Sequence, residues 1–368
     1  MSGVTRAALS SPTARQVAQW RSATAGLVVL SILLLALLAI AIMAAAIGAA
    51  GIPLGRLPAA LGLATGNIDP ATLARDQLVL WSVRLPRIVM AILIGTLLAG
   101  SGAIMQGLFR NPLADPALVG VSSGGALAAA ATIVIGDRML AASQTPLPFG
   151  FLPAAAFVGS LAATMILYRI ATRENRTSIA IFLLGGLAIA ALANAGIGLL
   201  VFIADDRQLR DVTFWLLGSL GGATWAKAAT LAPFVVAMLL ALPFTVRGLD
   251  YLALGEAEAF HMGVSVERLK RLSIVMVSAA VGAAVSFAGV IGFVGIVVPH
   301  LLRLVIGPTH RRLLPASLVF GAILLLAADS CARTIAAPAE VPIGILTALV
   351  GAPFFLAVLL RQRSLVGL

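Results

Sequence analysis

Long runs of apolar residues, separated by short stretches that carry the charges, divide almost the whole of this sequence. The runs are continuously apolar and do not alternate with polar residues, which favours membrane-spanning helices over the strands of a barrel. Charged residues make up 11% of the chain, against about 25% in soluble domains. A chain this apolar cannot cover its surface in water. The sequence therefore predicts an all-α polytopic membrane protein.

Ten apolar segments are expected to cross the bilayer as one domain of residues 23–361, between an N-terminal tail of residues 1–22 and a C-terminal tail of residues 362–368. The first run is about twice as long as the roughly 7–15 apolar residues of a signal peptide, so it is expected to be an uncleaved span. The third and eighth runs are short for a bilayer of about 30 Å, as in transporters with broken helices. The ten runs lie near 23–50, 88–108, 117–135, 151–170, 178–203, 228–246, 272–293, 298–307, 313–333 and 343–360.

The basic residues give the chain a formal net charge of +11, but they are dispersed between the apolar runs. A nucleic-acid-binding protein would gather them on one face, so we exclude that class. Ten spans put both termini on one side of the membrane. Fifteen of the 25 basic residues fall on that side and ten on the other, which predicts cytoplasmic termini by the positive-inside rule.

An internal repeat is visible when the chain is shifted by 187 residues. The matched residues open the second and seventh spans, which are five spans apart, so the two copies point in opposite directions. Such inverted repeats are common in transporters. The matches include Arg84 with Arg271, Gly95 with Gly282, Gly102 with Gly289, Pro112 with Pro299 and Gly120 with Gly307.

Residues for bond-making chemistry are missing from the expected patterns. Neither lysine stands in a Walker-type phosphate loop, and the three histidines are far apart. The single Cys331 excludes a disulfide framework and a cysteine-based metal site. His300 is interpreted as a helix-start and packing residue and not as a metal ligand. We expect no catalytic, cofactor-binding or metal site.

Four stretches, at residues 84–120, 252–264, 288–315 and 328–355, resemble the FecCD-type permease family. These are the membrane subunits of ABC importers for iron-siderophores, haem and vitamin B12, and the resemblance runs from about residue 25 to the C-terminus. It implies a ten-span type II importer permease that works as a homodimer in the bacterial inner membrane. It also implies two separate ATPase subunits on the cytoplasmic side and a periplasmic substrate-binding protein outside.

The segment near 250–268 lies between the sixth and seventh spans, on the expected cytoplasmic side. Its good helix formers and spaced apolar residues suit a short amphipathic helix, although an ordinary surface loop is an alternative. The resemblance implies that this is the coupling helix that docks on the ATPase. The residues expected to make that contact are Leu254, Gly255, Glu256, Ala257, Glu258, Phe260, His261, Met262 and Gly263.

Three arginines on the expected outer side also have a role by resemblance. Arg84, Arg87 and Arg303 are expected to meet acidic residues of the binding protein, because opposite charges steer encounter and orientation. The alternatives are anchoring at the headgroups for all three and, for Arg303, pairing with a carbonyl or with Asp329.

The resemblance implies that the transport path is lined by the third, fifth, eighth and tenth spans with the short helix after the fifth. Asn194 is a polar residue within the apolar fifth span. It is expected either to face the path or to make a hydrogen bond between helices.

The amino-acid sequence of residues 208–225 and 256–271 looks most like that of the haem permeases of the family, so haem is the expected cargo. Ferric siderophores and vitamin B12 are the alternatives. No cofactor is expected to be bound permanently, and ATP is expected to act through the partner subunit. An ion-coupled secondary transporter is a rival of another class, for which only Asp329 and Glu340 come close to the membrane-embedded acids required.

Overall fold

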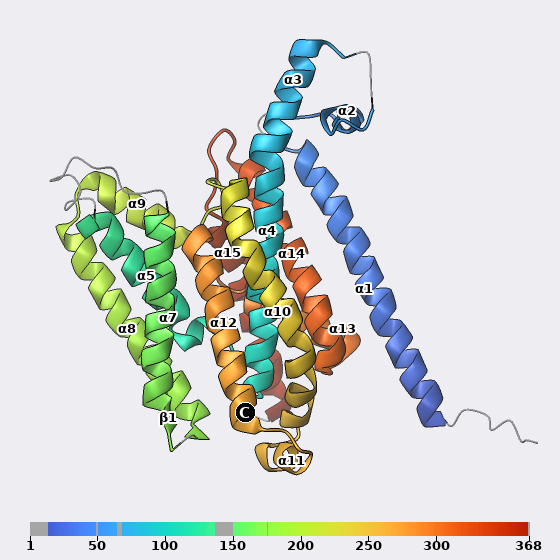
Figure 1. Ribbon diagram of the computed structural model, residues 1–368, viewed down its shortest axis with the longest axis vertical. Helices are drawn as coiled ribbons and strands as arrows, with labels where there is room; N and C mark the ends of the chain where they lie inside the picture. Colours follow the sequence, from blue (N-terminus) through green and yellow to red (C-terminus); the bar gives the residue numbers. More distant parts are fainter. Residues whose placement is uncertain (1–13, 49–50, 65–67, 137–149, 175, 367–368) are drawn as a thin grey trace, which may run out of the picture.

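The computed structural model describes residues 14–366 except 49–50, 65–67, 137–149 and 175, and this part of the chain is almost entirely helical (Figure 1). The first half contains α1 (Ala14–Ala46), η1 (Leu54–Arg56), α2 (Leu57–Ala60), α3 (Pro70–Val79), η2 (Leu80–Arg84), α4 (Leu85–Leu108), η3 (Pro116–Val119), α5 (Val121–Ala131), η4 (Thr132–Gly136) and α7 (Phe151–Ala171). The second half contains β1 (Thr172–Arg173), β2 (Arg176–Thr177), α8 (Ile179–Ile203), α9 (Asp206–Leu217), α10 (Trp225–Leu252), α11 (Glu256–His261), α12 (Val266–Ala288), α13 (Val294–Ile306), α14 (His310–Ile335) and α15 (Ile343–Val366).

Ten of these segments are apolar enough to lie in a membrane. Eight are long enough to cross it within the described residues, and two are shorter, Val121–Gly136 and Val294–Ile306. At about 1.5 Å per residue, α13 spans only about 20 Å. The short segments are the third and the eighth, as the sequence predicts, and the all-α polytopic class is confirmed.

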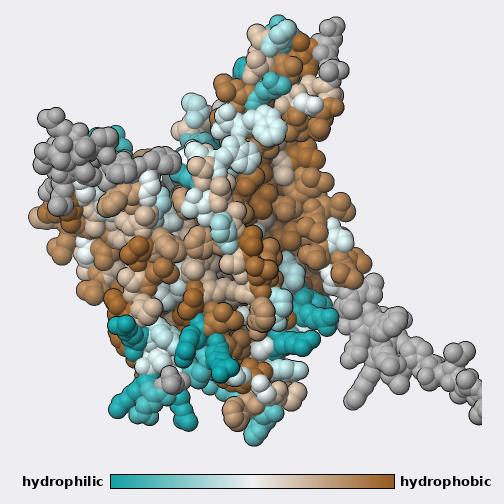
Figure 2. Space-filling model, in the orientation of Figure 1, coloured by the Kyte–Doolittle hydropathy of each residue, from teal (hydrophilic) through white to brown (hydrophobic). Residues whose placement is uncertain are grey.

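The two ends of the bundle are distinct. The start of α1, the end of α15 and α11 all lie at one end, and α2 and α3 lie at the opposite end (Figure 1). We call these the α11 end and the α3 end. A broad apolar band separates them, with hydrophilic side chains gathered at the α11 end (Figure 2). This pattern suits a protein that crosses a bilayer with both termini on the same side.

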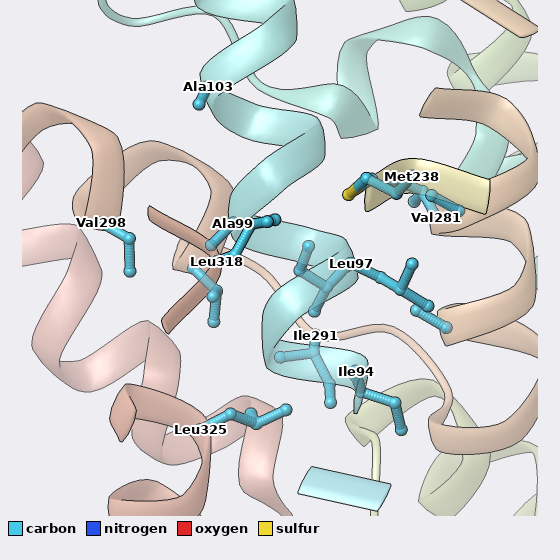
Figure 3. Packing of buried hydrophobic residues seen from close by; sticks show 14 of the residues in the cluster. Ile94, Leu97, Ala99, Ala103, Met238, Val281, Ile291, Val298, Leu318 and Leu325 are labelled. Carbon is cyan, nitrogen blue, oxygen red and sulfur yellow. The ribbon is translucent and has the colours of Figure 1, made fainter. Parts of the chain in front are cut away.

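Helix α4 lies at the centre of the largest group of helices. It packs against α14, α10, α12 and α13 and is buried along nearly all of its length. Ile94 and Leu97 of α4 lie beside Leu318 and Leu325 of α14 and Val281 of α12 (Figure 3). The core is therefore built around one helix, with α12 and α14 next in burial.

Glycines allow the close approach of these helices. A Cβ added to Gly95 would collide with the backbone of Gly321, and one added to Gly102 would collide with the backbone of Gly295. Small residues promote association in membranes because helices meet by direct backbone contact. Gly95 and Gly102 of the second span are therefore packing residues.

A second group of helices is formed by α5, α7 and α8, and α7 joins it to α12. Here Gly124 of α5 lies against Gly159 of α7 in the same backbone-to-backbone manner. The outward faces of the surrounding helices stay apolar and exposed, with Phe202 of α8 at 87% and Phe244 of α10 at 77%. Such faces are compatible with lipid tails or with further subunits.

The internal repeat is inverted, because α4 runs towards the α11 end and α12 runs away from it (Figure 1). The fixed shift of 187 residues holds only for these two helices. It pairs Gly120, which precedes α5, with Gly307, which follows α13. Residues 109–120 separate α4 from α5, whereas only residues 289–293 separate α12 from α13. The sequence matches beyond the first helix of each copy are therefore not structural equivalents.

Candidate functional site

The segment predicted to couple to a partner forms a short helix, α11, that projects from the bundle between α10 and α12 (Figure 1). Gly255 precedes it with φ +136°, a conformation that favours glycine. Glu256 and Glu258 lie in the first turn and His261 in the last, where the helix dipole favours acidic and basic groups respectively. The expected short helix is confirmed, and the surface-loop alternative is wrong.

Apolar side chains of this segment point away from the bundle. Leu254 is 68% exposed, Phe260 70% and Met262 57%, and Ala257 is exposed beside them. Ala259, in contrast, is fully buried against the bundle. We call Leu254, Ala257, Phe260 and Met262 the α11 surface. At a water-facing end of the molecule, exposed apolar residues of this size indicate a docking surface for another protein.

Lys270 of α12 fixes the position of α11 through hydrogen bonds. Its ammonium donates to Glu256 Oε2 at 3.0 Å, to Glu267 Oε1 at 2.9 Å and to the carbonyl of Thr177 at 3.2 Å. The Glu267 carboxylate also accepts from the backbone N–H of Thr177 at 3.1 Å. The side chain of Lys270 is only 4% exposed. One buried cation thus joins α11, α12 and the β1–β2 hairpin.

A second ionic cluster lies at the α3 end. Arg87 Nη2 lies 2.9 Å from Asp329, and its Nη1 lies 2.7 Å from Glu340. Arg333 Nε lies 3.2 Å from Asp329, one turn earlier on α14. Arg84 donates to the carbonyl of Ala45 at the end of α1. We call Arg87, Asp329, Arg333 and Glu340 the α3-end cluster.

Arg84 and Arg87 do not present their charges at the surface of this chain. Arg84 is 3% exposed and Arg87 6% exposed. Buried charges are stable only when paired and hydrogen-bonded, and here the partners are internal. Glu340, with a side chain 42% exposed, is the member of the α3-end cluster that solvent reaches most easily. A docking role for the two arginines stays a prediction, and it requires them to act through this cluster.

Arg303 does not join the other two arginines. Its Nη1 donates to Gln106 Oε1 at 2.6 Å, and Gln106 lies 19 residues after Arg87 on α4, a distance of about 28 Å along the helix. Arg303 therefore lies towards the α11 end, and its expected outer position is wrong. With Arg303 moved, sixteen basic residues are assigned to the side of the α11 end and nine to the side of the α3 end. Of the two alternative partners, Asp329 is wrong because it pairs with Arg87 and Arg333, whereas the contact with the side-chain carbonyl of Gln106 agrees with the carbonyl alternative.

The sequence reasoning missed Arg333 and Gln106. Arg333 supplies the third arginine at the α3 end, and its spacing of four residues from Asp329 on one helix was the available signal. Gln106 Nε2 donates to the carbonyls of Gly295 and Ile296. The Gly295 carbonyl needs this donor because Pro299, four residues later in α13, has no N–H.

His300 lies within α13, which begins at Val294, and not at the head of the helix as the sequence suggested. Its ring contacts Phe354 of α15, with ring centroids 5.7 Å apart and nearly perpendicular planes. This packing contact is the expected one. Within the described residues, no group of three or more His, Cys, Asp or Glu side chains has the arrangement of a metal site.

Asn194 lies on an exposed face of α8. Leu184, Leu192 and Leu199 share this exposure at 65–75%, and no described side chain of this chain packs over the amide. Leu187, which is 65% exposed, lies seven residues before Asn194, so the two share one side of the helix. The expected hydrogen bond between helices is not formed by Asn194 within the described part of the chain, and its place on the transport path stays a prediction.

Comparison with known proteins gives a consistent picture. Residues 32–361 match the FecCD transport family. The hemin transport system permease of Yersinia pestis is 42% identical over 323 residues, which cover 82% of this chain and 93% of that protein. The cobalamin import permease of Halobacterium salinarum is 45% identical over 288 residues, covering 78% of this chain and 74% of that protein.

A solved structure of a metal-chelate type ABC transporter in an inward-facing conformation has the same fold. It superposes with a TM-score of 0.76 at 32% identity and covers 90% of this chain and 98% of that chain. The vitamin B12 import permease of Serratia proteamaculans is a further relative, at 39% identity over 289 residues. Family, fold and membrane topology thus agree with one another.

Proposed function

Because this chain belongs to the FecCD transport family and is an ABC importer permease, we propose that its cargo is haem and that it moves haem inwards by alternating access. The observation that carries the proposal is the likeness to the hemin permease of Yersinia pestis, which extends over 93% of that protein. Haem is the cargo and not a resident group. Permeases of this family work with ATPase and substrate-binding partners, so the chain supplies the path and the partners supply energy and delivery.

The α11 surface is the site at which we place the ATPase. Its exposed apolar residues Leu254, Phe260 and Met262 suit a cleft in a partner protein, and aromatic residues are frequent energetic centres of such contacts. Glu258 and His261 beside them add polar specificity. ATP acts only through this partner: closure of the ATPase pair displaces α11, and α11 displaces the helices attached to it.

A second copy of this chain is the occupant we propose for the exposed faces of α8 and α15. Both helices are less than a quarter buried over their apolar windows. Asn194 of α8 and Leu349 of α15 then face the two-fold axis, where the path runs. A weakly polar path suits a large, mostly apolar cargo, because strong bonds would hold it.

The α3 end is assigned to the outer surface of the bacterial inner membrane, and the α11 end with both termini to the cytoplasm. The division of basic residues, sixteen against nine, supports this orientation. A periplasmic binding protein then docks over the α3-end cluster. Its acidic residues compete with Glu340 for Arg87, so Arg84 and Arg87 act from just beneath the contact surface. Arg303 has no part in this docking.

Cobalamin is the second candidate cargo. The permease of Halobacterium salinarum that imports it has the higher identity, 45%, although over a smaller share of that protein. Ferric siderophores are the third cargo class of the family. An ion-coupled mechanism is disfavoured because Asp329 and Glu340 are both paired with arginines and so are poor proton relays.

Uptake measured in proteoliposomes tests the proposal. The permease is reconstituted with its ATPase and binding protein, and haem, a ferric siderophore and cobalamin are offered separately. Haem uptake that requires ATP is expected. If cobalamin but not haem is taken up with ATP, the proposed cargo is rejected and the family assignment stands. If haem is taken up without any ATPase, the proposed coupling of an ATPase to α11 is rejected.

A further inference from the structure

We propose that Lys270 is a positioning residue that fastens the coupling segment to the start of α8, so that a displacement of α11 is delivered to the transport path. The inference rests on the proposed function only in taking α11 as the contact for the ATPase. The link itself is a property of this chain alone, and it runs through three contacts of one buried side chain.

The first step is the saturation of the Lys270 ammonium. A lysine ammonium has three N–H donors, and three acceptors surround it: Glu256 Oε2, Glu267 Oε1 and the Thr177 carbonyl, at 2.9–3.2 Å. Each acceptor belongs to a different element, namely α11, α12 and β2. The side chain is 4% exposed, so these acceptors enclose the ammonium and the three elements are held together.

The second step is the fixing of Thr177 from both sides. Its carbonyl accepts from Lys270, and its N–H donates to Glu267 Oε2 at 3.1 Å. Lys270 and Glu267 are three residues apart on α12 and are themselves paired. The hairpin end therefore cannot shift relative to α12 unless two charge-assisted hydrogen bonds break, and such bonds are stronger than neutral ones.

The third step leads from the hairpin into α8. Thr177 is followed by Ser178, which caps α8 by accepting from the Ile181 N–H. The backbone between the Lys270 contact and the first turn of α8 is thus one residue long. Helix α8 carries the exposed face with Asn194 that we assign to the path. A displacement of Glu256 is transmitted to α8 without passing through a flexible loop.

The direct chain connection is less suited to this task. Along the sequence α11 leads to α12 through residues 262–265, which include Gly263 at φ +83° and two exposed neighbours. Helix α12 in turn is largely buried against α4 and α7. Lys270 supplies a shorter route, from the exposed α11 to the weakly buried α8.

The link is tested first in the permease alone. Spin labels are attached at Arg173→Cys in the hairpin and Ala257→Cys in α11, both exposed, in a Cys331→Ser background. We expect one narrow distance distribution, and a clearly broader one after Lys270→Met. Equal widths with and without Lys270 would overturn the link. Lys227→Met, a change of the only other lysine, at the opposite end of the bundle, is the matched control and should leave the width unchanged.

The use of the link is tested in the full complex. Lys270→Met should keep ATPase capture and ATP hydrolysis within about twofold, and lower the uptake of cargo per ATP by at least about fivefold, the lower range of coupling between sites. Lys227→Met should keep that ratio. If Lys270→Met does not fold, Glu267→Gln serves, because its side chain is 33% exposed and the substitution weakens only the contacts of α12 with Lys270 and with the Thr177 N–H. An unchanged ratio in both would overturn the inference.

The two proposals fail differently. If the unaltered chain captures no ATPase, the proposed function fails, and the broadening after Lys270→Met alone still supports the link. If capture and uptake are normal in the unaltered chain and in both variants, the proposed function stands and the positioning role of Lys270 is rejected.

Discussion

The two ends of the bundle place their charged and apolar side chains in opposite ways. At the α3 end, Arg87, Asp329 and Arg333 are buried in an ionic cluster. At the α11 end, the apolar residues Leu254, Phe260 and Met262 are exposed, and the buried Lys270 fixes the helix that carries them. The comparison teaches that one end buries its charges in internal pairs, whereas the other uses a buried charge to hold an exposed apolar surface. Four substitutions test this difference, in order of decreasing expected effect.

Asp329→Ala should lower the stability of the chain more than the other three substitutions, through the α3 end. The substitution leaves Arg87 and Arg333 buried without their shared acid, and removing one partner of a buried ion pair costs about 3–5 kcal/mol. Reversible unfolding of the purified permease in mixed micelles measures the loss. A loss below about 1 kcal/mol would mean that the cluster is hydrated in the membrane and contributes no more than a surface pair.

Phe260→Ser should affect the α11 end without destabilising it. The ring is 70% exposed, so its loss costs little within the chain, whereas an aromatic hot spot is worth about 2 kcal/mol or more in binding. Capture of the ATPase is expected to weaken by about thirtyfold, with an unchanged unfolding midpoint. Phe214→Ser, 55% exposed on α9, is the matched control, and equal weakening by both would remove the special role of α11.

Glu340→Gln should loosen the α3 end only mildly. The side chain is 42% exposed and lies 2.7 Å from Arg87 Nη1, and an amide oxygen can still accept that hydrogen bond. We expect a loss of about 1 kcal/mol and an altered affinity for the binding protein, measured by titration onto nanodiscs. A loss as large as that of Asp329→Ala would show that the partly exposed and buried acids are equivalent.

Arg207→Ala should have the smallest effect and provides the baseline. Arg207 and Asp211 form an exposed pair on α9, 3.9 Å apart, with side chains 81% and 55% exposed. Such pairs contribute less than about 0.5 kcal/mol. The same unfolding measurement applies. A larger loss of unfolding free energy would indicate that another subunit covers α9.

The sequence predicts the elements well, because apolar run length and helix-forming composition are local properties. It identifies the short third and eighth segments and the helix at Glu256. Arg303 was misplaced because the hydropathy pattern does not show that α13 begins at Val294, after Phe293 adopts a left-handed conformation. The helix therefore begins four residues before the predicted start.

The contacts that give the sites their geometry are not local. Lys270 meets Thr177, 93 residues earlier, and Arg87 meets Glu340, 253 residues later. Arg87 is buried against acids contributed by α14 and the loop after it, and Arg84 donates to the carbonyl of Ala45 at the end of α1. No pattern within a window of one helix contains that information.

The glycine contacts of α4 set a limit on how this transporter can move. Because Gly95 meets the backbone of Gly321 and Gly102 meets that of Gly295, no side chains lie between α4 and its neighbours at these two contacts. Sliding α4 by one residue would drive Cβ atoms into those backbones. The helices around α4 in the middle of this chain then stay fixed relative to one another throughout the transport cycle. The change between outward-open and inward-open states is left to the loosely packed helices that surround them.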